Sequence, residues 1–184
     1  MHGAIFAELE RFAVGSIGAD FWKQMLDSAG LGARVYLPVA TYPDEEALAL
    51  VGAASQLSGK SAAEILTSFG EHLAPPLLDM YGSLLRPTWR TLDLLEHTET
   101  TIHRIVRQRE PDATPPELTC ERTSDQEVVI TYRSPRRLCA LAIGLARGVA
   151  RHYAESIEIQ ERECMHRGAP HCVIRLRLAA AQPS

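Results

Sequence analysis

The sequence has no run of 18 apolar residues, so no segment is expected to cross a membrane. Its first residues, MHGAIFAELERF, reach an acidic side chain at position 8 without a basic cluster before it, so no secretory signal is expected. Basic residues do not predominate either. There are 19 Lys and Arg against 23 Asp and Glu, a net charge of −4, which argues against a nucleic-acid-binding surface.

Cysteine is scarce, with four in 184 residues. Without a secretory signal these thiols are expected in a reducing compartment, and we predict a cytoplasmic protein. Grouped thiols there suggest metal or redox chemistry rather than structural disulfides. Hydrolase and nucleotide-binding motifs are also missing, because the sequence lacks G-x-S-x-G, a P-loop, H-E-x-x-H and the dinucleotide glycine fingerprint.

What is present is an ordinary globular composition, 46% hydrophobic and 23% charged, in a length that suits one domain. Apolar residues recur at helical spacing through the first half, and short alternating segments predict strands in the second. The predicted fold class is α+β: a helical N-terminal half packed over a C-terminal antiparallel sheet with one or two helices. We expect a single domain, 1–184, with a helical subdomain 1–60 and a second subdomain 61–184.

Local signals mark the helix ends. Asp44 is predicted to cap one helix, and Ser61 with Glu64 forms a capping box for the next. The pair Pro75-Pro76 is expected to break that second helix, because proline lacks a backbone N–H.

A long helix is predicted after Pro87, with Leu95, His103 and Val106 near one face. His103 therefore lies on an apolar face. It is either a core histidine satisfied by one hydrogen bond or a metal ligand, since imidazole is the commonest metal-binding side chain. Spacing alone does not distinguish the two.

Strands and one more helix are predicted in the second half. The predicted strands are 117–121, 127–133 and two more joined by a turn at 167–170. The helix, 138–153, carries small residues such as Gly144 and Gly148, which suit close packing on a sheet.

Tyr132, Ser134 and Arg136 alternate at the end of a predicted strand, so an extended backbone puts their side chains on one side. A phenol, a hydroxyl and a guanidinium together would clamp a carboxylate. The alternative is a strand end followed by a helix cap, with Ser134 as the cap and Arg136 in solvent. Spacing alone favours the alternative.

Three cysteines form a possible metal set. Cys164 and Cys172 flank a tight turn, and Cys139 begins the preceding predicted helix. Three thiolates with one further ligand make a common closed zinc site. The alternative is three buried, inert cysteines. His166 and His171 lie in the same turn and favour metal.

Together these residues resemble the haem-nitric oxide/oxygen-binding (H-NOX) domains, relatives of the sensor domain of soluble guanylate cyclase. The resemblance covers almost the whole chain. Its most specific element is Tyr132-x-Ser134-x-Arg136, similar to the family's haem-propionate signature, which follows His103 in the expected order. The other matching segments are Met1-His2-Gly3, Val51-Gly52-Ala53-Ala54-Ser55, Phe69-Gly70 and Ala113-Thr114-Pro115-Pro116.

The resemblance implies a b-type haem between the two halves. His103 would be the protein ligand of the haem iron, and Tyr132, Ser134 and Arg136 would hold the propionates. The ligand interpretation of His103 is then favoured over the core interpretation.

The same resemblance implies a mechanism. Pro116 looks like the family proline that presses on the haem and bends it, and Ile5 and Leu145 are expected to pack against the macrocycle. Family behaviour implies that His103 releases the iron when NO binds, so that the strain held by Pro116 relaxes and the N-terminal half pivots.

Gas selectivity is expected from three leucines. O₂-binding relatives look as if they place a tyrosine five residues after the last arginine of the motif, where this sequence has Leu141. Two supporting polar positions fall on Leu9 and Leu73. Without a donor to a bound O₂, we expect the protein to exclude O₂ and to bind NO, and also CO.

The expected output is a signal rather than turnover. The chain ends without a kinase or cyclase segment, so we expect it to act in trans, and the resemblance suggests a histidine kinase or a cyclic-di-GMP enzyme as partner. The alternative is a zinc-thiolate redox sensor in which haem plays little part. A haem peroxidase ranks lower, because no distal acid–base group is expected.

A subset of bacterial relatives resembles this chain around its cysteines and binds Zn²⁺ with three cysteines and a histidine. The position of that histidine is Glu161 here. The fourth ligand stays open among Glu161, His166 and His171. In an extended strand Glu161 and Cys164 point to opposite faces, so Glu161 would need a β-bulge to reach the site.

Overall fold

The computed structural model describes residues 1–110 and 113–179. The helices are α1 (Gly3–Ser16), α2 (Ala19–Ser28), α3 (Asp44–Ser58), α4 (Ala62–Tyr81), α5 (Thr91–Thr98), α6 (Arg104–Arg109) and α7 (Cys139–His152). The strands are β1 (Glu117–Ser124), β2 (Glu127–Arg133), β3 (Ile157–Glu163) and β4 (Cys172–Leu178). Short helical turns are η1 (Gly82–Leu84), η2 (Glu99–His103) and η3 (Met165–Arg167).

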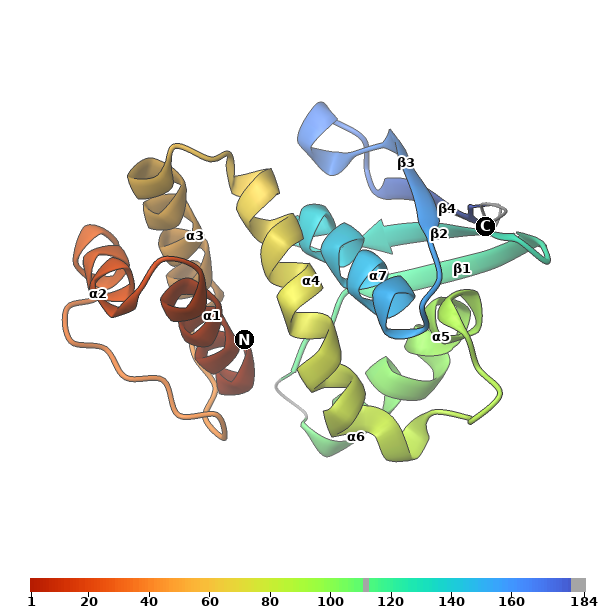
Figure 1. Cartoon of the computed structure of the whole chain (residues 1–184), viewed down its shortest axis with the longest axis horizontal. Coiled ribbons are helices and arrows are strands. Elements are labelled where there is room, and N and C mark those ends of the chain that lie inside the picture. The colour runs from red at the N-terminus through yellow and green to blue at the C-terminus, as the bar shows by residue number, and fades with distance from the viewer. Residues whose placement is uncertain (111–112, 180–184) are drawn as a thin grey trace.

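The architecture is α+β, as predicted. Helices α1, α2 and α3 form one end of the molecule, the sheet forms the other, and α4 runs between them beside α7 (Figure 1). A subdomain boundary near residue 60 stays a prediction, because α4 contributes residues to the hydrophobic clusters on both of its sides.

The sheet is antiparallel throughout, with strand order β1-β2-β4-β3. Alternate residues of β2, including Val128 and Tyr132, are buried beneath the helices. The register places Tyr132 opposite Cys172 of β4. The register between β3 and β4 shifts between Glu161 and Glu163. This is the β-bulge that Glu161 was predicted to need in order to point toward the cysteines.

The two predicted helix caps, at Asp44 and Ser61, are correct to within a residue. The capping box is confirmed, since Ser61 Oγ accepts a hydrogen bond from the Glu64 N–H at 3.2 Å and Glu64 Oε2 accepts one from the Ser61 N–H at 2.9 Å. Asp44 is not the cap of α3, because Pro43 takes that position and Asp44 is the first helical residue. The Asp44 carboxylate is used elsewhere, as described below.

The predicted break at Pro75-Pro76 is wrong, because α4 continues through both prolines. Each proline removes one helical hydrogen bond, at a cost of roughly 3 kcal/mol in an isolated helix. Here the helix is covered on both sides, and the preceding Leu73 and Ala74 are each only 1% exposed. Packing therefore outweighs the local preference.

The small residues of α7 face α4 rather than the sheet. A Cβ at Gly144 would lie 2.1 Å from the Thr67 carbonyl oxygen, and one at Gly148 would lie 2.4 Å from Ala74 Cβ. Only glycine permits this approach of the two helices. The expectation that these glycines pack on the sheet was wrong, since the neighbouring Ala146 takes that role.

The long helix predicted after Pro87 is interrupted. α5 ends at Thr98, a π-helical turn covers Glu99–His103, and α6 follows. Single π turns inside helices often occur at functional sites. This turn bears His103.

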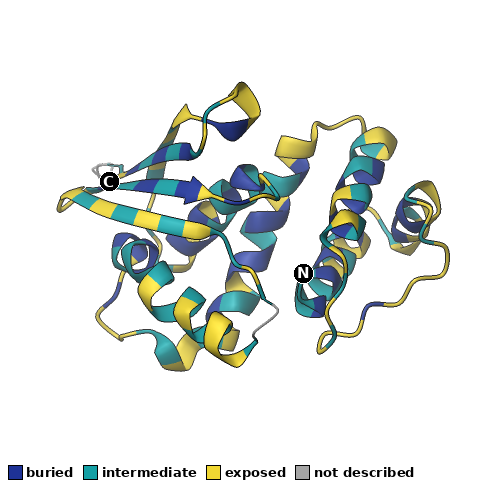
Figure 2. Cartoon of the chain, turned by 180° about the vertical axis from the view of Figure 1, so that it is seen from behind, coloured by how far each residue is buried: buried dark blue, intermediate teal, exposed yellow. Residues whose placement is uncertain are grey.

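Within residues 1–110 and 113–179, buried side chains form three clusters: one among the N-terminal helices and α4, one between the sheet, α5 and α7, and one joining α4, α5 and α7. Figure 2 shows the buried faces of the helices turned toward one another, with the outer faces exposed. α4 and α7 thus connect the two ends of the molecule.

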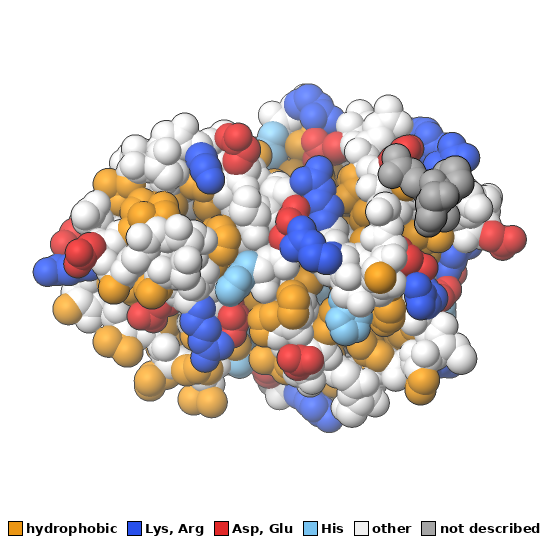
Figure 3. All heavy atoms as spheres, in the orientation of Figure 1, with side chains coloured by type: hydrophobic (Ala, Val, Ile, Leu, Met, Phe, Trp, Pro, Cys, Tyr) orange, Lys and Arg blue, Asp and Glu red, His pale blue; other side chains and the backbone are white. Residues whose placement is uncertain are grey.

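The surface carries charges of both signs. On the face drawn in Figure 3, basic and acidic side chains are interspersed, and hydrophobic side chains gather toward the lower left. Val35, Leu37 and Val39, before α3, are among the most exposed hydrophobic residues, from 57% to 88%. Among the described residues, no helix is both long and apolar enough to traverse a bilayer.

Candidate functional site

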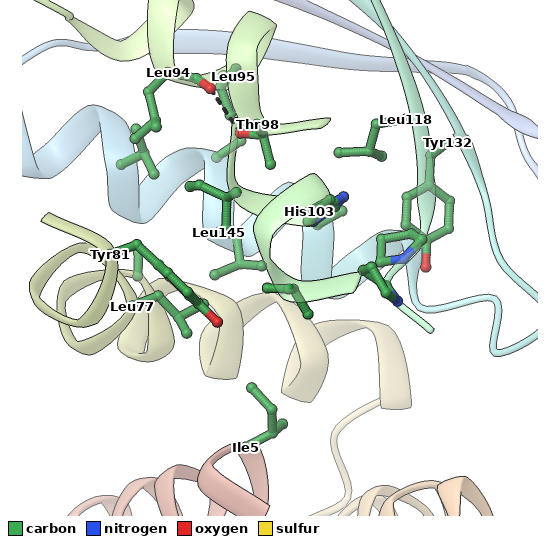
Figure 4. Close-up of a pocket in the computed structure, with 18 of the residues that line it drawn as sticks. Ile5, Leu77, Tyr81, Leu94, Leu95, Thr98, His103, Leu118, Tyr132 and Leu145 are labelled. Carbon is green, nitrogen blue, oxygen red and sulfur yellow. Dashed lines mark hydrogen bonds between the residues drawn. The ribbon is translucent and has the colours of Figure 1, made fainter. Parts of the chain in front are cut away.

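A cavity of about 330 Å³ lies where α1, α4, the α5–α6 segment, α7 and the sheet meet. That volume is within the roughly 300–1,000 Å³ range of small-molecule pockets. Figure 4 shows its largely apolar wall. Its apolar lining includes Ile5, Leu77, Leu94, Leu95, Ile102, Pro116, Leu118, Leu145 and Val149.

His103 lies on the inner wall of this cavity, and Ile5 reaches in from α1 on the side away from it (Figure 4). Its Nδ1 lies 2.9 Å from Glu99 Oε2. Because a carboxylate only accepts hydrogen bonds, Nδ1 carries the proton and Nε2 keeps a free lone pair. Burial lowers the pKa of His103, and the neighbouring Glu99 opposes this only in part. The lowered pKa favours the neutral imidazole, the form that can bind a metal through Nε2.

Tyr132 and Arg136 line the cavity, whereas Ser134 has another role. Ser134 Oγ accepts a hydrogen bond from the Arg136 backbone N–H at 3.3 Å, so the hydroxyl shapes the turn that carries Arg136. Burial raises the pKa of Tyr132, so its phenol stays protonated and able to donate. Ser134 is absent from the cavity lining, but its side chain lies beside the Tyr132 phenol, so the three residues stay together although the chain leaves the extended conformation after Arg133.

Arg136 is not in solvent, since its side chain is only 12% exposed. Its Nε lies 3.1 Å from Asp44 Oδ2, while Asp44 Oδ1 lies 2.9 Å from the Met1 ammonium. The Arg136 Nε contact is an ion pair without hydrogen-bond alignment, which leaves that buried N–H without a good acceptor. A second Arg136 nitrogen donates to Thr114 Oγ1 at 2.8 Å. We call this polar part of the lining, formed by Arg136, Thr114 and Glu110, the mouth of the cavity; Arg136 pairs with one carboxylate there, that of Asp44.

Five other predicted contacts divide into two groups. Pro116, Ile5 and Leu145 line the cavity. Leu9 and Leu141 instead line a small separate hollow beside it.

Leu73 is buried in the N-terminal core and lies outside both linings. The polar side chain that does reach the cavity from α4 is Tyr81, which the sequence analysis missed (Figure 4). Burial raises the pKa of Tyr81, and the Glu110 carboxylate at the mouth raises it further. None of the three leucines therefore lines the cavity, whereas two phenols, those of Tyr81 and Tyr132, do.

The cysteine prediction converges on a second site. Cys139 Sγ lies 3.7 Å from Cys164 Sγ, and Cys172 Sγ lies 3.8 Å from Cys164 Sγ. Tetrahedral zinc with Zn–S bonds of about 2.3 Å separates its sulfurs by roughly 3.8 Å. Burial raises the pKa of the Cys139 thiol above its usual value, as it does for Cys172. Cys120 lies apart on β1, and burial raises its pKa to about 12.

Glu161 is the fourth group of this cluster. One of its carboxylate oxygens and the three sulfurs all lie within 4.8 Å of one another. The two histidines point elsewhere. His166 Nε2 is 2.8 Å from the Arg137 carbonyl oxygen, and His171 Nε2 is 3.8 Å from Glu163 Oε2.

Sequence reasoning missed Glu99, Asp44 in its ion-pair role, and Tyr81. Glu99 lies four residues before His103, a helical spacing that brings side chains together, so this signal was present. Asp44 and Tyr81 depend on contacts between distant segments, for which the sequence offers no local signal.

A buried neutral imidazole, an apolar cavity and a carboxylate-holding mouth define a protein suited to a metal-bearing, carboxylate-bearing flat cofactor. Comparison with known families gives this class a name. The family model HNOB, described as haem-NO-binding, matches residues 2–161. The chain therefore belongs to the haem-NO-binding (H-NOX) family.

Solved structures agree with this assignment. An H-NOX protein from S. oneidensis in the Fe(II) state, carrying three substitutions, is 27% identical, with a TM-score of 0.91 and coverage of 99% of this chain and 98% of that chain. The S. oneidensis protein in the Fe(II)NO state is also 27% identical, with a TM-score of 0.90 and coverage of 97% of this chain and 99% of that chain. An H-NOX protein from K. algicida shares the fold at 24% identity and a TM-score of 0.89, with both chains fully covered. A search of the curated proteins finds no match.

Proposed function

We propose that this protein is a haem-based sensor that binds NO at ferrous haem, excludes O₂ and signals in trans to a partner protein. The observation that carries the proposal is the neutral His103 imidazole, which lines an apolar cavity with its Nδ1 occupied by Glu99. NO is the proposed input because the S. oneidensis relative was solved in Fe(II)NO and Fe(II)CO states. CO is the second expected ligand.

When bound, the haem would supply an iron that takes a diatomic gas. His103 would offer Nε2 to that iron. Tyr132 and Arg136 would donate to the propionates, and Ser134 would position Arg136 through its backbone contact. Arg136 suits such a group, since its guanidinium already pairs with the Asp44 carboxylate.

The cavity wall supports the exclusion of O₂. A bound O₂ carries partial negative charge and needs a donor, whereas NO binds ferrous haem without one. Ile5, Leu77 and Leu145 provide no donor. Tyr81 has a hydroxyl, but it lies at the end of α4, close enough to the Glu110 carboxylate for that charge to affect it. We assign Tyr81 to the mouth rather than to the gas-binding position.

Signalling would use the contacts between the N-terminal unit, 1–60, and the rest of the chain. Asp44 links the Met1 ammonium to Arg136, and His2 Nε2 lies 3.6 Å from Glu110 Oε1. Release of His103 would free the π turn and Pro116 to move, and these contacts would pass the movement to α1 and α3. A histidine kinase or a cyclic-di-GMP enzyme would read that movement.

The test is hydrogen exchange in residues 1–60, with and without NO, in the haem-loaded protein and in His103→Gly supplied with free imidazole. We expect NO to change exchange in the wild-type protein only, since free imidazole can bind the iron but cannot pull on the chain. An equal NO response in the variant would contradict the scheme.

We also propose a zinc site at Cys139, Cys164, Cys172 and Glu161, which would give a second, redox-sensitive input. The sulfur separations of 3.7 and 3.8 Å support it. A cation would also remove the burial penalty on these thiolates. Oxidation of the thiolates would release zinc. If this input acted alone, the protein would be a zinc-thiolate redox sensor.

Zinc content per chain in anaerobically purified protein tests this site. We expect a value near one in wild type, a lower value in Glu161→Gln, and no change in Glu163→Gln, whose side chain is 57% exposed on the same strand. A wild-type value near zero would exclude the site. An equal effect of both substitutions would remove Glu161 as a ligand.

A further inference from the structure

Glu99 makes a direct contact with the imidazole that lines the cavity. Its Oε2 lies 2.9 Å from His103 Nδ1, and both side chains are largely buried, at 25% and 15% exposure. The two residues begin and end the π-helical turn. The irregular turn and the carboxylate–imidazole pair are therefore one local structure, placed where α5 passes into α6.

The Glu99 carboxylate is held from three sides. Besides His103, its Oε2 accepts a hydrogen bond from the Leu118 backbone N–H of β1 at 3.2 Å, and its Oε1 pairs with the Arg107 guanidinium of α6. A side chain fixed by a helix, a strand and an imidazole has little freedom to turn away. Its contact with Nδ1 is thus a property of the fold.

We propose that Glu99 is a positioning residue that sets how strongly the His103 imidazole donates electrons to the haem iron. This inference rests on the proposed function, because it requires iron at His103 Nε2. A carboxylate that holds the Nδ1 proton fixes the tautomer and the ring plane and makes Nε2 a stronger donor. The stronger donor favours ferric over ferrous iron and tightens the bond that NO must weaken.

Arg107 has the opposite effect. By pairing with Oε1 it withdraws negative charge from the carboxylate, so the Nδ1 proton is held less strongly than by a free carboxylate. Glu99 and Arg107 together therefore set an intermediate donor strength. This arrangement predicts opposite effects from the two substitutions that remove them.

The chain offers a matched control on the same helical segment. Glu96 lies one turn earlier, has 31% side-chain exposure, and pairs with Arg122 rather than with an imidazole. Glu96→Gln and Glu99→Gln remove the same charge from the same region. Only Glu99→Gln changes the group that holds the His103 proton, and glutamine preserves the side-chain shape.

The experiment uses the full chain loaded with haem and measures two quantities without NO: the iron–histidine stretching band of the ferrous protein by resonance Raman, and the reduction potential. Changes in groups behind a metal ligand typically alter affinity 10- to 100-fold. A tenfold change in the preference of His103 for ferric over ferrous iron corresponds to about 59 mV. We expect Glu99→Gln to lower the band frequency and raise the potential by at least this amount.

Three further results complete the test. Glu96→Gln should change neither quantity, and Arg107→Gln should lower the potential. Glu99→Gln should also speed the loss of the iron–histidine bond after NO addition, by about tenfold.

Equal shifts in Glu99→Gln and Glu96→Gln would overturn the inference, since they would show a general charge effect. So would an unchanged band in Glu99→Gln when the wild-type band is present, and so would a rise in potential in Arg107→Gln. A wild-type protein that takes up haem without any iron–histidine band would instead overturn the proposed function, and this inference with it. The two failures are thereby distinguishable.

Discussion

The cavity around His103 and the thiol cluster share α7 but are constructed in contrasting ways. The cavity collects side chains from α1, α4, α5, α7 and the sheet, so it depends on how the two ends of the molecule meet. The cluster draws on the start of α7 and one hairpin, β3–β4. A site spread over many elements can report a movement between them, whereas a compact site responds to its own chemistry. We therefore expect two independent inputs, NO at the cavity and oxidation at the cluster, each of which can be removed by substitution without affecting the other.

The largest expected effect is a loss of zinc from the thiol cluster that leaves haem binding in the cavity unchanged. Cys164→Ser should reduce zinc content from near one to near zero, because structural zinc contributes roughly 10–16 kcal/mol of apparent binding free energy that needs every thiolate. The haem absorption spectrum should not change. Cys120→Ser, on β1 away from the cluster, should keep its zinc. Metal analysis and spectra of the two variants make the comparison, and zinc retained in Cys164→Ser would contradict it.

A substitution at the mouth of the cavity should have the opposite result: weaker haem binding with unchanged zinc content. Arg136→Ala removes a charge-assisted hydrogen bond to a propionate, worth about 1.5–3 kcal/mol, so haem should dissociate roughly 10- to 150-fold faster. Zinc content should remain at the wild-type value. Haem transfer to apomyoglobin measures the rate. An unchanged rate would mean that Arg136 stays with Asp44 when haem is present.

A third prediction concerns α7, which both sites share. Gly144→Ala places a methyl group 2.1 Å from the Thr67 carbonyl oxygen and should lower the free energy of unfolding by about 1–3 kcal/mol. Gly52→Ala in α3 meets nothing within 4 Å and should stabilise by up to about 1 kcal/mol. Chemical denaturation compares them. Equal stability changes would show that α4 and α7 can separate at little cost.

The smallest effect sharpens the description of the cavity itself. Tyr81→Phe removes the hydroxyl that we place at the mouth, so CO affinity should change by less than about threefold, or roughly 0.6 kcal/mol. Flash photolysis of the CO complex measures this. If the wild-type protein held O₂ and Tyr81→Phe released it, Tyr81 would be a distal donor and our placement would be wrong.

The two sites also differ in how far the sequence predicted them. The turn between Cys164 and Cys172 predicted their approach. Glu161 came from the resemblance and stayed open beside His166 and His171, and strand alternation added only that it would need a bulge, which β3 has. The cavity was predicted from a motif and a resemblance. These identified His103, Tyr132 and Arg136, but not Glu99, although Glu99 lies four residues before His103.

Long-range packing explains the remaining errors. Pro75 and Pro76 stay within α4 because the helix is packed on both sides, and no local rule contains that information. For the same reason Gly144 and Gly148 were predicted to face the sheet, although they face α4. The sequence predicts which segments are helices and which are strands. It does not predict which neighbouring element each helix face packs against.

The most direct test of the central claim is the absorption spectrum of the haem-loaded, anaerobically reduced protein, recorded first alone, then with NO, and separately in air. We predict a five-coordinate ferrous spectrum that shifts with NO and forms no stable complex with O₂. A stable O₂ complex would contradict the proposed selectivity. A protein that remains colourless after haem is supplied would contradict the haem sensor altogether and leave the zinc-thiolate cluster as the input.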